Sequence, residues 1–374
     1  MTIQSSIQVV PRWRVTVYLA ALCGTALASA CRGGTSPAVS REPAPGERFF
    51  AGLKQLTFGG QNAEAYFSAD GTQLIFQRTA DDVGCDQQFI IDVDGRNMHR
   101  VSNGLGRTTC GYFYQGDQRI VYASTFHAGE ACPPEADRSR GYVWALYDYD
   151  IYTSRVDGSD LQRIFRSDGY DAEATLSPDG QTIVFTSTRD GDLDIYTMKV
   201  DGSDVRKLTN QIGYDGGPFF SHDGTMIVYR AWHPTDPDQL ADYQTLLAEN
   251  LVRPNRMEIW VMNADGTNQR QVTNLGGANF APYFLPDDRR IIFSSNHHLE
   301  DRTQPNFDLF LVNLDGTGVT QVTTDGDFDG FPMFSPDGTK LVFASNRYGS
   351  EPRETNIFVA DWVEPNASTA AGGK

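Results

Sequence analysis

The sequence predicts an all-β fold, a six-bladed β-propeller of four-stranded antiparallel blades, from three observations. Turn residues recur at a fixed interval, aromatic residues recur at two fixed positions of each unit, and a segment before the first unit resembles the strand that the last unit lacks. Regular four-stranded units with turn and aromatic residues at fixed positions are typical of propellers. The chain of 374 residues is long enough for one large all-β domain.

Residues 170–209 show one unit most plainly. Four runs rich in Val, Ile, Thr, Tyr and Phe are separated by turns that end at Gly180 and Gly202. Glycine adopts a positive φ in such hairpins without steric cost, and the runs have the composition of half-buried strands. A single meander of this kind cannot bury both of its faces, so we expect it to pack against further copies of itself.

Six such units are expected between residues 50 and 363. The second turn of one unit and the first turn of the next always lie 22 residues apart: Gly95 and Asp117, Gly158 and Gly180, Gly202 and Gly224, Gly266 and Asp288, Gly316 and Gly338. Every second strand carries an aromatic residue, at Phe76, Tyr122, Phe185, Tyr229, Phe293 and Phe343. Every third strand carries one too, at Phe89, Tyr152, Tyr196, Trp260, Phe310 and Phe358.

The two ends of the repeat region predict how the ring closes. The last unit stops after its third strand, while Leu53–Thr57 matches the fourth strand of residues 205–209. We therefore expect residues 50–57 to complete the sixth blade, which removes an open sheet edge.

The N-terminus has the features of an export signal. Arg12 and Arg14 precede an apolar run, small residues follow up to Ala30, and Cys31 comes next. The run is too short for a good membrane span. A cysteine in this place resembles a bacterial lipobox, so residues 1–30 are expected to be a signal peptide and Cys31 a lipidation site; cleavage without lipidation is the alternative. Residues 31–49 are expected to be the lipid-attachment cysteine and a flexible tether, and residues 364–374 a disordered tail.

Charge narrows the range of partners. The chain has 31 basic and 48 acidic residues, a net charge of −17. Nucleic-acid binding depends on neutralising phosphates, so this class of partner is excluded. We expect contact with a membrane through the lipid anchor only.

The repeat resembles a known family. Its pattern runs through Ser177-Pro178-Asp179-Gly180, Asp194-Ile195-Tyr196, the turn at Gly202, and Leu208-Thr209. This pattern is similar to the TolB-type WD40-like propeller repeat, and the resemblance covers residues 50–363. It implies the propeller fold and, because TolB-type proteins act in an envelope protein complex, an envelope role.

All length variation falls between the second and third strands of the units. The insertions are residues 79–87, 125–147, 231–256, 297–306 and 347–355. In a meander these loops share one side of the propeller, here named the elaborated face, and binding residues concentrate on such loops. Within 233–252, Asp236 or Thr235 as cap, Pro237, and apolar residues at helical spacing predict a short helix.

Acidic and amide side chains recur where the first strands begin on that face. Two alternatives remain for them: capping of local backbone groups, or an oxygen-rich site for a hard cation such as Ca²⁺, with Asp171, Asp215 and Asp329 at its centre. Residues two positions further on should share the same side. The candidates are Asn62, Glu64, Asp171, Glu173, Asp215, Asn279 and Asp329.

The loops supply further candidates. His127, Arg138, Arg140 and Trp144 suit a sugar or peptide pocket, or a loop that packs on its own aromatic residues. His127, His233, His297 and His298 all fall in the insertions and could bind a transition metal or act as acid or base. The chain also resembles oligogalacturonate lyase, a propeller with metal-binding histidines at its mouth, and this resemblance implies a metal-binding role for these histidines.

Three cysteines remain after Cys23 and Cys31: Cys85, Cys110 and Cys132. An exported location permits one disulfide and leaves one thiol, and the pairs that include Cys110 look reachable.

Two functions are left open by these observations. The first is a monomeric, exported lipoprotein of a bacterial envelope, periplasmic or outer-membrane-associated, that binds a protein, peptide or glycan through the elaborated face. The second is a metal- or histidine-dependent lyase or hydrolase acting on polysaccharide or peptide at the same face.

Overall fold

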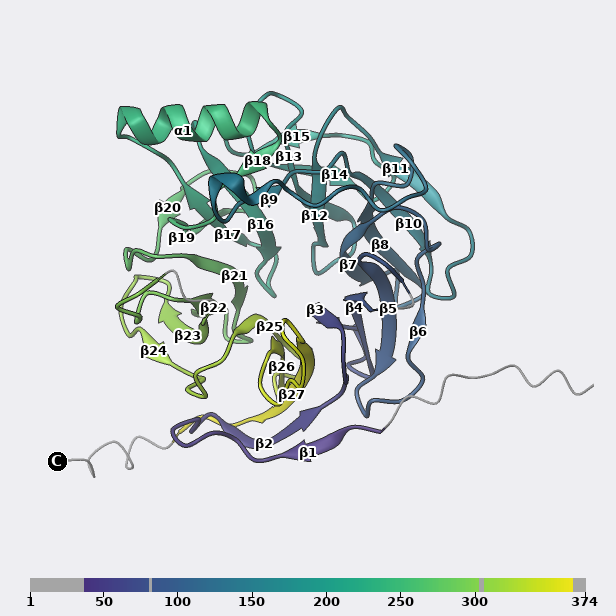
Figure 1. Ribbon diagram of the computed structural model, residues 1–374, viewed down its shortest axis with the longest axis vertical. Helices are drawn as coiled ribbons and strands as arrows, with labels where there is room; N and C mark the ends of the chain where they lie inside the picture. The colour runs from purple at the N-terminus through teal and green to yellow at the C-terminus, as the bar shows by residue number, and fades with distance from the viewer. Residues whose placement is uncertain (1–36, 81–82, 303–305, 366–374) are drawn as a thin grey trace, which may run out of the picture. The chain divides into compact units, whose positions relative to one another are not determined.

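The computed structural model describes residues 37–80, 83–302 and 306–365. The predicted signal peptide, Cys31 and residues 366–374 lie outside this range. The described part is a six-bladed β-propeller, as predicted, with the blades arranged around a central axis (Figure 1). Among the described residues, no helix has the length and apolar character needed to cross a membrane.

Five blades are consecutive four-stranded antiparallel sheets. Blade one has β3 (Gln61–Phe67), β4 (Gln73–Thr79), β5 (Gln87–Asp92) and β6 (His99–Arg100); blade two has β7 (Thr108–Tyr114), β8 (Arg119–Ser124), β10 (Asp150–Arg155) and β11 (Gln162–Phe165). Blade three has β12 (Asp171–Leu176), β13 (Thr182–Ser187), β14 (Asp194–Lys199) and β15 (Arg206–Lys207); blade four has β16 (Tyr214–Phe220), β17 (Met226–Trp232), β19 (Glu258–Asn263) and β20 (Arg270–Gln271). Blade five has β21 (Asn279–Phe284), β22 (Arg290–Ser295), β23 (Asp308–Asn313) and β24 (Thr320–Gln321).

Blade six closes the ring with both ends of the repeat region. It contains β25 (Asp329–Phe334), β26 (Lys340–Ser345), β27 (Asn356–Trp362) and β2 (Phe50–Gln55), and Leu53 pairs with Ala360 as the closure prediction requires. The chain joins this sheet earlier than the predicted boundary, because β1 (Val39–Arg41) pairs with β2 inside the segment expected to be a tether.

The repeated aromatic residues form the centre of each blade. In all six blades the aromatic residue of the second strand stands directly opposite that of the third strand, as in Phe185 opposite Tyr196 and Phe343 opposite Phe358. Cross-strand aromatic pairs of this kind stabilise a sheet and bury a large apolar area.

The Leu-Thr signature of the fourth strand also has a physical role. The hydroxyl of Thr209 accepts a hydrogen bond from the backbone N–H of Ile195 at 2.9 Å, and Thr273, Thr323 and Thr57 repeat this contact in blades four, five and six. The hydroxyl thus holds the short outer strand to its neighbour where few backbone bonds exist.

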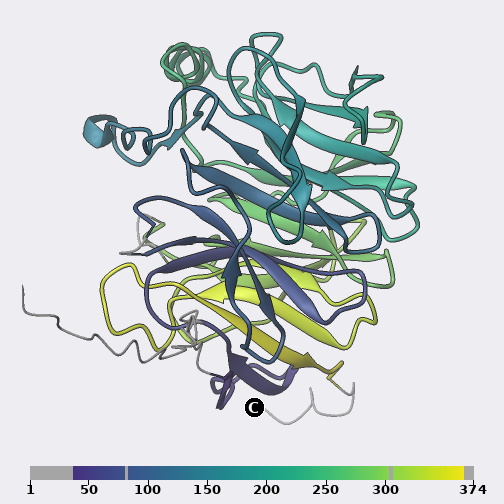
Figure 2. The ribbon, with the colours of Figure 1, turned by 90° about the vertical axis from the view of Figure 1, so that its right-hand side faces the viewer.

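The insertions of blades two and four meet on the elaborated face. β9 (Trp144–Ala145) of the first pairs with β18 (Leu251–Val252) of the second. The 3-10 helix η1 (Arg138–Arg140) and the α-helix α1 (Pro237–Ala248) flank this two-stranded sheet and lie on the same side of the propeller (Figure 2). We call these four elements the cap.

The predicted helix is confirmed as α1. Its apolar face buries Tyr243 and Leu246. Asp236 is the N-cap, and its carboxylate accepts hydrogen bonds from the N–H groups of Asp238 and Gln239, both at 3.1 Å.

Replacing Asp236 by Ala is expected to destabilise α1 by about 1 kcal/mol, because two backbone donors lose their acceptor. Hydrogen exchange should accelerate in α1 and remain unchanged in β16 and β17. Asp236→Asn, which keeps an acceptor, is the matched control and should exchange like the wild type. Unchanged exchange in the Ala variant would show that cap packing alone holds the helix.

Candidate binding site at the propeller axis

Each inner strand contains a β-bulge at the same place. Pairing with the second strand shifts register there, and one residue of the bulge has a positive φ. These six bulge residues are Glu64, Cys110, Glu173, Gly217, Ala281 and Phe331, with φ between 49° and 61°. They come from the strands nearest the axis (Figure 1).

The bulge separates two sets of residues that were expected to share one side. Asp171 is buried within blade three, where it accepts hydrogen bonds from Ser187 at 2.5 Å and Ser167 at 2.7 Å. Glu173 lies within the register shift and contacts blade four instead. The side-chain alternation of a regular strand therefore does not hold across this position.

The first residues of the inner strands lie in separate blades. Asp215 pairs with His233 at 3.0 Å, Asp329 pairs with Arg347 at 2.9 Å, and Asn62 donates to the carbonyl of Thr355 at 2.8 Å. Asn279 similarly donates to the carbonyl of Met257 at 2.9 Å. Asp171, Asp215 and Asp329 are thus not brought together as the Ca²⁺ hypothesis required. Each has a partner in its own blade, but Asp215 Oδ2 and Asp329 Oδ1 accept no hydrogen bond from the described residues.

The bulge residues of blades one to three belong to a polar group that we call the axial cluster: Glu64, Cys110, Glu173, Tyr214 and Arg230. Glu173 forms an ion pair with Arg230 and accepts hydrogen bonds from the N–H of Gly217 and the hydroxyl of Thr186, both at 2.7 Å. Arg230 also donates to the Tyr214 hydroxyl at 2.6 Å. A β-carbon at Gly217 would lie 2.0 Å from Arg230 Nη1, so only glycine leaves room for the guanidinium.

Glu64 has fewer hydrogen-bond partners than Glu173. Burial, together with the charge of Glu173, raises its pKa to about 7, while the Cys110 thiol and Arg230 oppose this rise. Burial also raises the pKa of Cys110 well above its usual value, and so this thiol stays protonated. The group carries two carboxylates and one guanidinium.

Removing the charge of Glu64 should make stability less dependent on pH. The folded pKa near 7 exceeds the ordinary 4.5, so the folded state keeps a proton that the unfolded state releases. This contribution is full below the ordinary pKa and is lost as the pH rises to about 7. Denaturant unfolding of wild type and Glu64→Gln at several pH values should show wild type losing stability relative to the variant over that interval. Parallel curves would contradict the raised pKa.

The other half of the axis is apolar. Phe280, Phe307, Phe328 and Phe331 form one aromatic group, with neighbouring ring centroids 5.0–6.4 Å apart. The rings of Phe307, Phe328 and Phe331 are partly exposed, and Phe280 is buried. A second group, Tyr66, Tyr112, Phe219 and Tyr283, is made by residues beyond the bulges, with centroids 5.4–6.5 Å apart.

The cap reaches the axial cluster through Trp144. Its ring lies 5.4 Å from the Arg230 guanidinium, and its indole N–H donates to the Tyr142 hydroxyl at 3.1 Å. Arg140 pairs with Glu249 at 2.7 Å, which connects η1 to the end of α1. Arg138 begins η1, but its side chain lies outside the described part of the structure.

The histidines of the insertions pair with acids or hydroxyls of their own blades. His127 contacts Asp150 at 2.9 Å and Asp148 at 3.3 Å, and His298 contacts Asp308 at 3.0 Å. His297 contacts the Ser295 hydroxyl at 2.8 Å. Within the described ranges, the groups that could hold a metal ion include no histidine. The predicted histidine cluster is therefore dispersed.

One disulfide joins Cys85 to Cys132 and leaves Cys110 free. Both pairs that had looked reachable from the sequence contain Cys110. Cys110 instead occupies the bulge of β7, while the insertion of blade two brings Cys132 to the loop between β4 and β5 of blade one.

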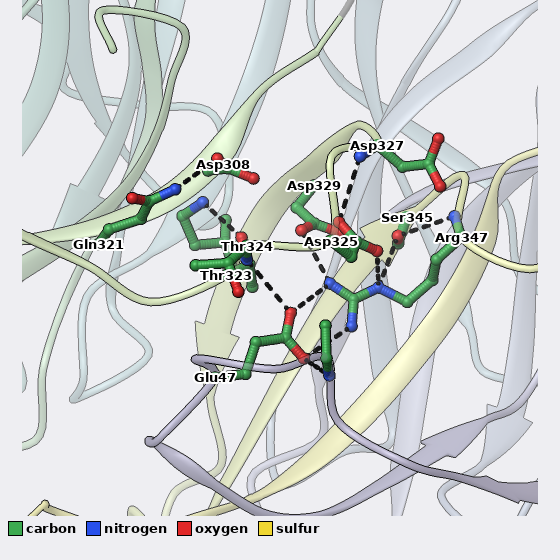
Figure 3. A network of polar contacts seen from close by, with 12 residues as sticks. Glu47, Asp308, Gln321, Thr323, Thr324, Asp325, Asp327, Asp329, Ser345 and Arg347 are labelled. Carbon is green, nitrogen blue, oxygen red and sulfur yellow. Dashed lines mark hydrogen bonds and ion pairs between the residues drawn. The ribbon is translucent and has the colours of Figure 1, made fainter.

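A buried ion network lies apart from the axial cluster in blade six (Figure 3). Arg347 contacts Glu47 at 2.8 Å, Asp329 at 2.9 Å and Asp325 at 2.7 Å. These acids form the one candidate cation group among the described residues, and the guanidinium already lies against all three. Burial raises the pKa of Asp329, and Arg347 opposes the rise.

Sequence reasoning did not select Arg230 as a binding residue. The sequence nevertheless distinguishes Arg230 from the equivalent residues of the other blades. The residue after the second-strand aromatic is a long cationic residue only in blade four; in the other blades it is Gln77, Ala123, Thr186, Ser294 and Ala344.

Comparison with solved structures supports the fold. A putative TolB from Agrobacterium tumefaciens is 17% identical, with a TM-score of 0.53, over 82% of this chain and 91% of that one. A gluconolactonase from Xanthomonas campestris is 13% identical, with a TM-score of 0.57, over 88% and 98% of the two chains. An oligogalacturonate lyase from Vibrio parahaemolyticus is 13% identical, with a TM-score of 0.51, over 88% and 97%. At these identities the likeness concerns the fold alone.

Sequence comparison adds the family. No curated protein matches the chain in sequence. The family model of the TolB beta propeller domain matches residues 145–241 and 251–367, more than half of the chain. The repeated sequence pattern, the ring of six blades and this match together show that the chain belongs to the TolB β-propeller family.

Proposed function

We propose that this protein is a monomeric, exported binding protein of the bacterial envelope, and that the elaborated face takes up a peptide segment of a protein partner. The observation that carries the proposal is the division of the axial residues into two halves. One half presents Glu64, Glu173 and Arg230, and the other presents partly exposed phenylalanine rings.

Such a division suits a peptide better than a uniformly polar glycan. Peptides offer apolar side chains for aromatic surfaces together with charged or hydrogen-bonding groups, and aromatic and arginine residues are enriched where binding energy concentrates. The cap adds Trp144 at one side of the same site. TolB-type propellers act in an envelope protein complex, which agrees with a protein partner.

Site-specific photo-crosslinking tests the proposal. A photoreactive phenylalanine analogue at Phe331 should form adducts with an envelope protein in intact cells. The same analogue at Thr267, an exposed residue of a tight turn on the opposite side, is the matched control and should form none. Adducts from the Thr267 position only, or none from Phe331, would contradict binding at this face.

Lipid attachment at Cys31 is part of the proposal and has its own test. Cells fed labelled palmitate should yield a labelled protein, and Cys31→Ala should abolish the label because the acceptor thiol is lost. The Cys110→Ala variant should stay labelled. Equal labelling of wild type and the Cys31 variant would refute the anchor.

The enzymatic alternative depended on histidines acting together. His127, His233 and His298 lie in three separate blades, and each contacts an acid of its own blade, an arrangement that favours a structural role for them. Turnover of oligosaccharides or peptides by the purified protein, lost on changing one of these histidines to Ala, would reverse this preference.

A further inference from the structure

The repeat allows two positions of the axial cluster to be compared directly. Glu64 in blade one and Glu173 in blade three are the bulge residues of equivalent inner strands. Glu173 is partnered by blade four, which supplies the Gly217 N–H at 2.7 Å and the Arg230 guanidinium, and by the Thr186 hydroxyl of its own blade. Blade two, which stands in the same relation to Glu64, supplies no such pair.

The difference is set by one residue of the second strand. Arg230 stands opposite Gly216, the residue before the bulge glycine, and in blade two the corresponding residue opposite Thr109 is Ala123. Ala123 has no cation to offer. The other donor is also taken, because the N–H of Cys110 bonds to the Gln77 side chain at 3.4 Å.

Glu64 is consequently left with an unfilled acceptor. Its Oε2 atom is shielded from solvent and has no hydrogen-bond partner among the described residues. The charged groups around it are Glu173, Arg230 and Asp86, with the Cys110 thiol adjacent. Arg230 is engaged by Glu173, and Asp86 pairs with Arg107 at 3.2 Å, so the surroundings lack one positive charge.

We propose that Glu64 receives a cationic group of the bound ligand, an ammonium or guanidinium, in the place that Arg230 takes beside Glu173. This deepens the proposed function, on which it rests, by naming the chemical class that the site selects. Charge-assisted hydrogen bonds to a carboxylate are strong, and a shielded acceptor gains most from being filled.

The neighbouring blade indicates what the cation is attached to. Phe331 is the bulge residue of blade six, whose inner strand β25 packs beside β3, and its partly exposed ring belongs to the aromatic half of the axis. Aromatic faces attract organic cations and their apolar substituents. The site therefore favours an amine next to an apolar group, as in a peptide, over a bare metal ion.

Titration calorimetry on the purified full-length chain tests this with phenethylammonium as the probe and 2-phenylethanol as its neutral counterpart. The ammonium should bind at least about ten-fold more tightly than the alcohol, and Glu64→Gln should remove that preference. Asp201→Asn, in a tight turn far along the chain, is the matched charge-removal control and should bind like wild type. Equal binding of amine and alcohol, no binding of either, or an unaffected Glu64→Gln variant would overturn the proposal.

A second variant tests the same proposal without changing Glu64, in case the Glu64→Gln protein does not fold. Ala123→Arg copies the arrangement of blade four and should abolish ammonium binding while thermal unfolding remains cooperative. Titration with KCl and CaCl₂ separates the sources of positive charge, and tight, Glu64-dependent binding of either metal ion alone would overturn the organic-cation assignment. If the Phe331 crosslink persists while the amine fails to bind, the inference fails and the proposed function stands; if the crosslink is also absent, both fail.

Discussion

Replacing Arg347 by Met is expected to lower the free energy of unfolding by about 3–5 kcal/mol, the cost of leaving buried acids without their counter-charge. Arg347 is 4% exposed, and Glu47 and Asp329 are also buried. The guanidinium contacts all three acids of the network and the Ser345 hydroxyl at 3.0 Å. Chemical denaturation monitored by tryptophan fluorescence measures the loss.

The equivalent arginine of blade three provides the control. Arg189 follows Ser187 as Arg347 follows Ser345, but it is exposed and lies over the rings of Phe165 and Tyr196. Arg189→Met should cost far less, and Glu47→Gln combined with Arg347→Met should recover part of the stability. Equal losses in the two arginine variants would show that ring contacts, rather than the buried acids, account for the effect.

Removing the disulfide with Cys85→Ser and Cys132→Ser is expected to cost about 4 kcal/mol, since the bond closes a long loop in the unfolded chain. The two cysteines are 47 residues apart. The bond also attaches the insertion of blade two to blade one, so the cap should become more accessible to protease than the blades.

Reduction provides the control for this prediction. Dithiothreitol should lower the midpoint of wild-type unfolding to that of the double variant and should leave the variant unchanged. If the reductant shifts both proteins equally, the loss in the variant arises from the serine side chains and not from the missing bond.

The fold could be predicted from local chemistry because each repeated residue has a repeated contact. The two aromatic series stand opposite each other in every blade, and threonines such as Thr209 hold the fourth strand. The strand at residues 50–55 and the helix capped by Asp236 followed from the same kind of reasoning.

The site could be predicted only in part because it depends on a backbone irregularity. Strand alternation places Asp171 and Glu173 on one side, but the bulge turns the first into blade three and the second toward Arg230 of blade four. Turn residues mark this bulge in blade four only, at Gly217, because Glu, Cys, Ala and Phe adopt its positive φ in the other blades. Pairing of Cys85 with Cys132 likewise depends on the path of a long loop.

The closure of blade six has a consequence for how the protein folds. β2 can pair early with β1, but its other edge must wait for β27, because Leu53 meets Ala360 only when the end of the chain has been made. Closing so long a loop is entropically slow, and the contact is among the most distant in the chain. A chain delivered from its N-terminus would therefore hold a hairpin with one open edge, able to pair with other chains, until the end of its synthesis. We expect assembly of the ring to be the rate-limiting event and early release from a holding chaperone to favour aggregation.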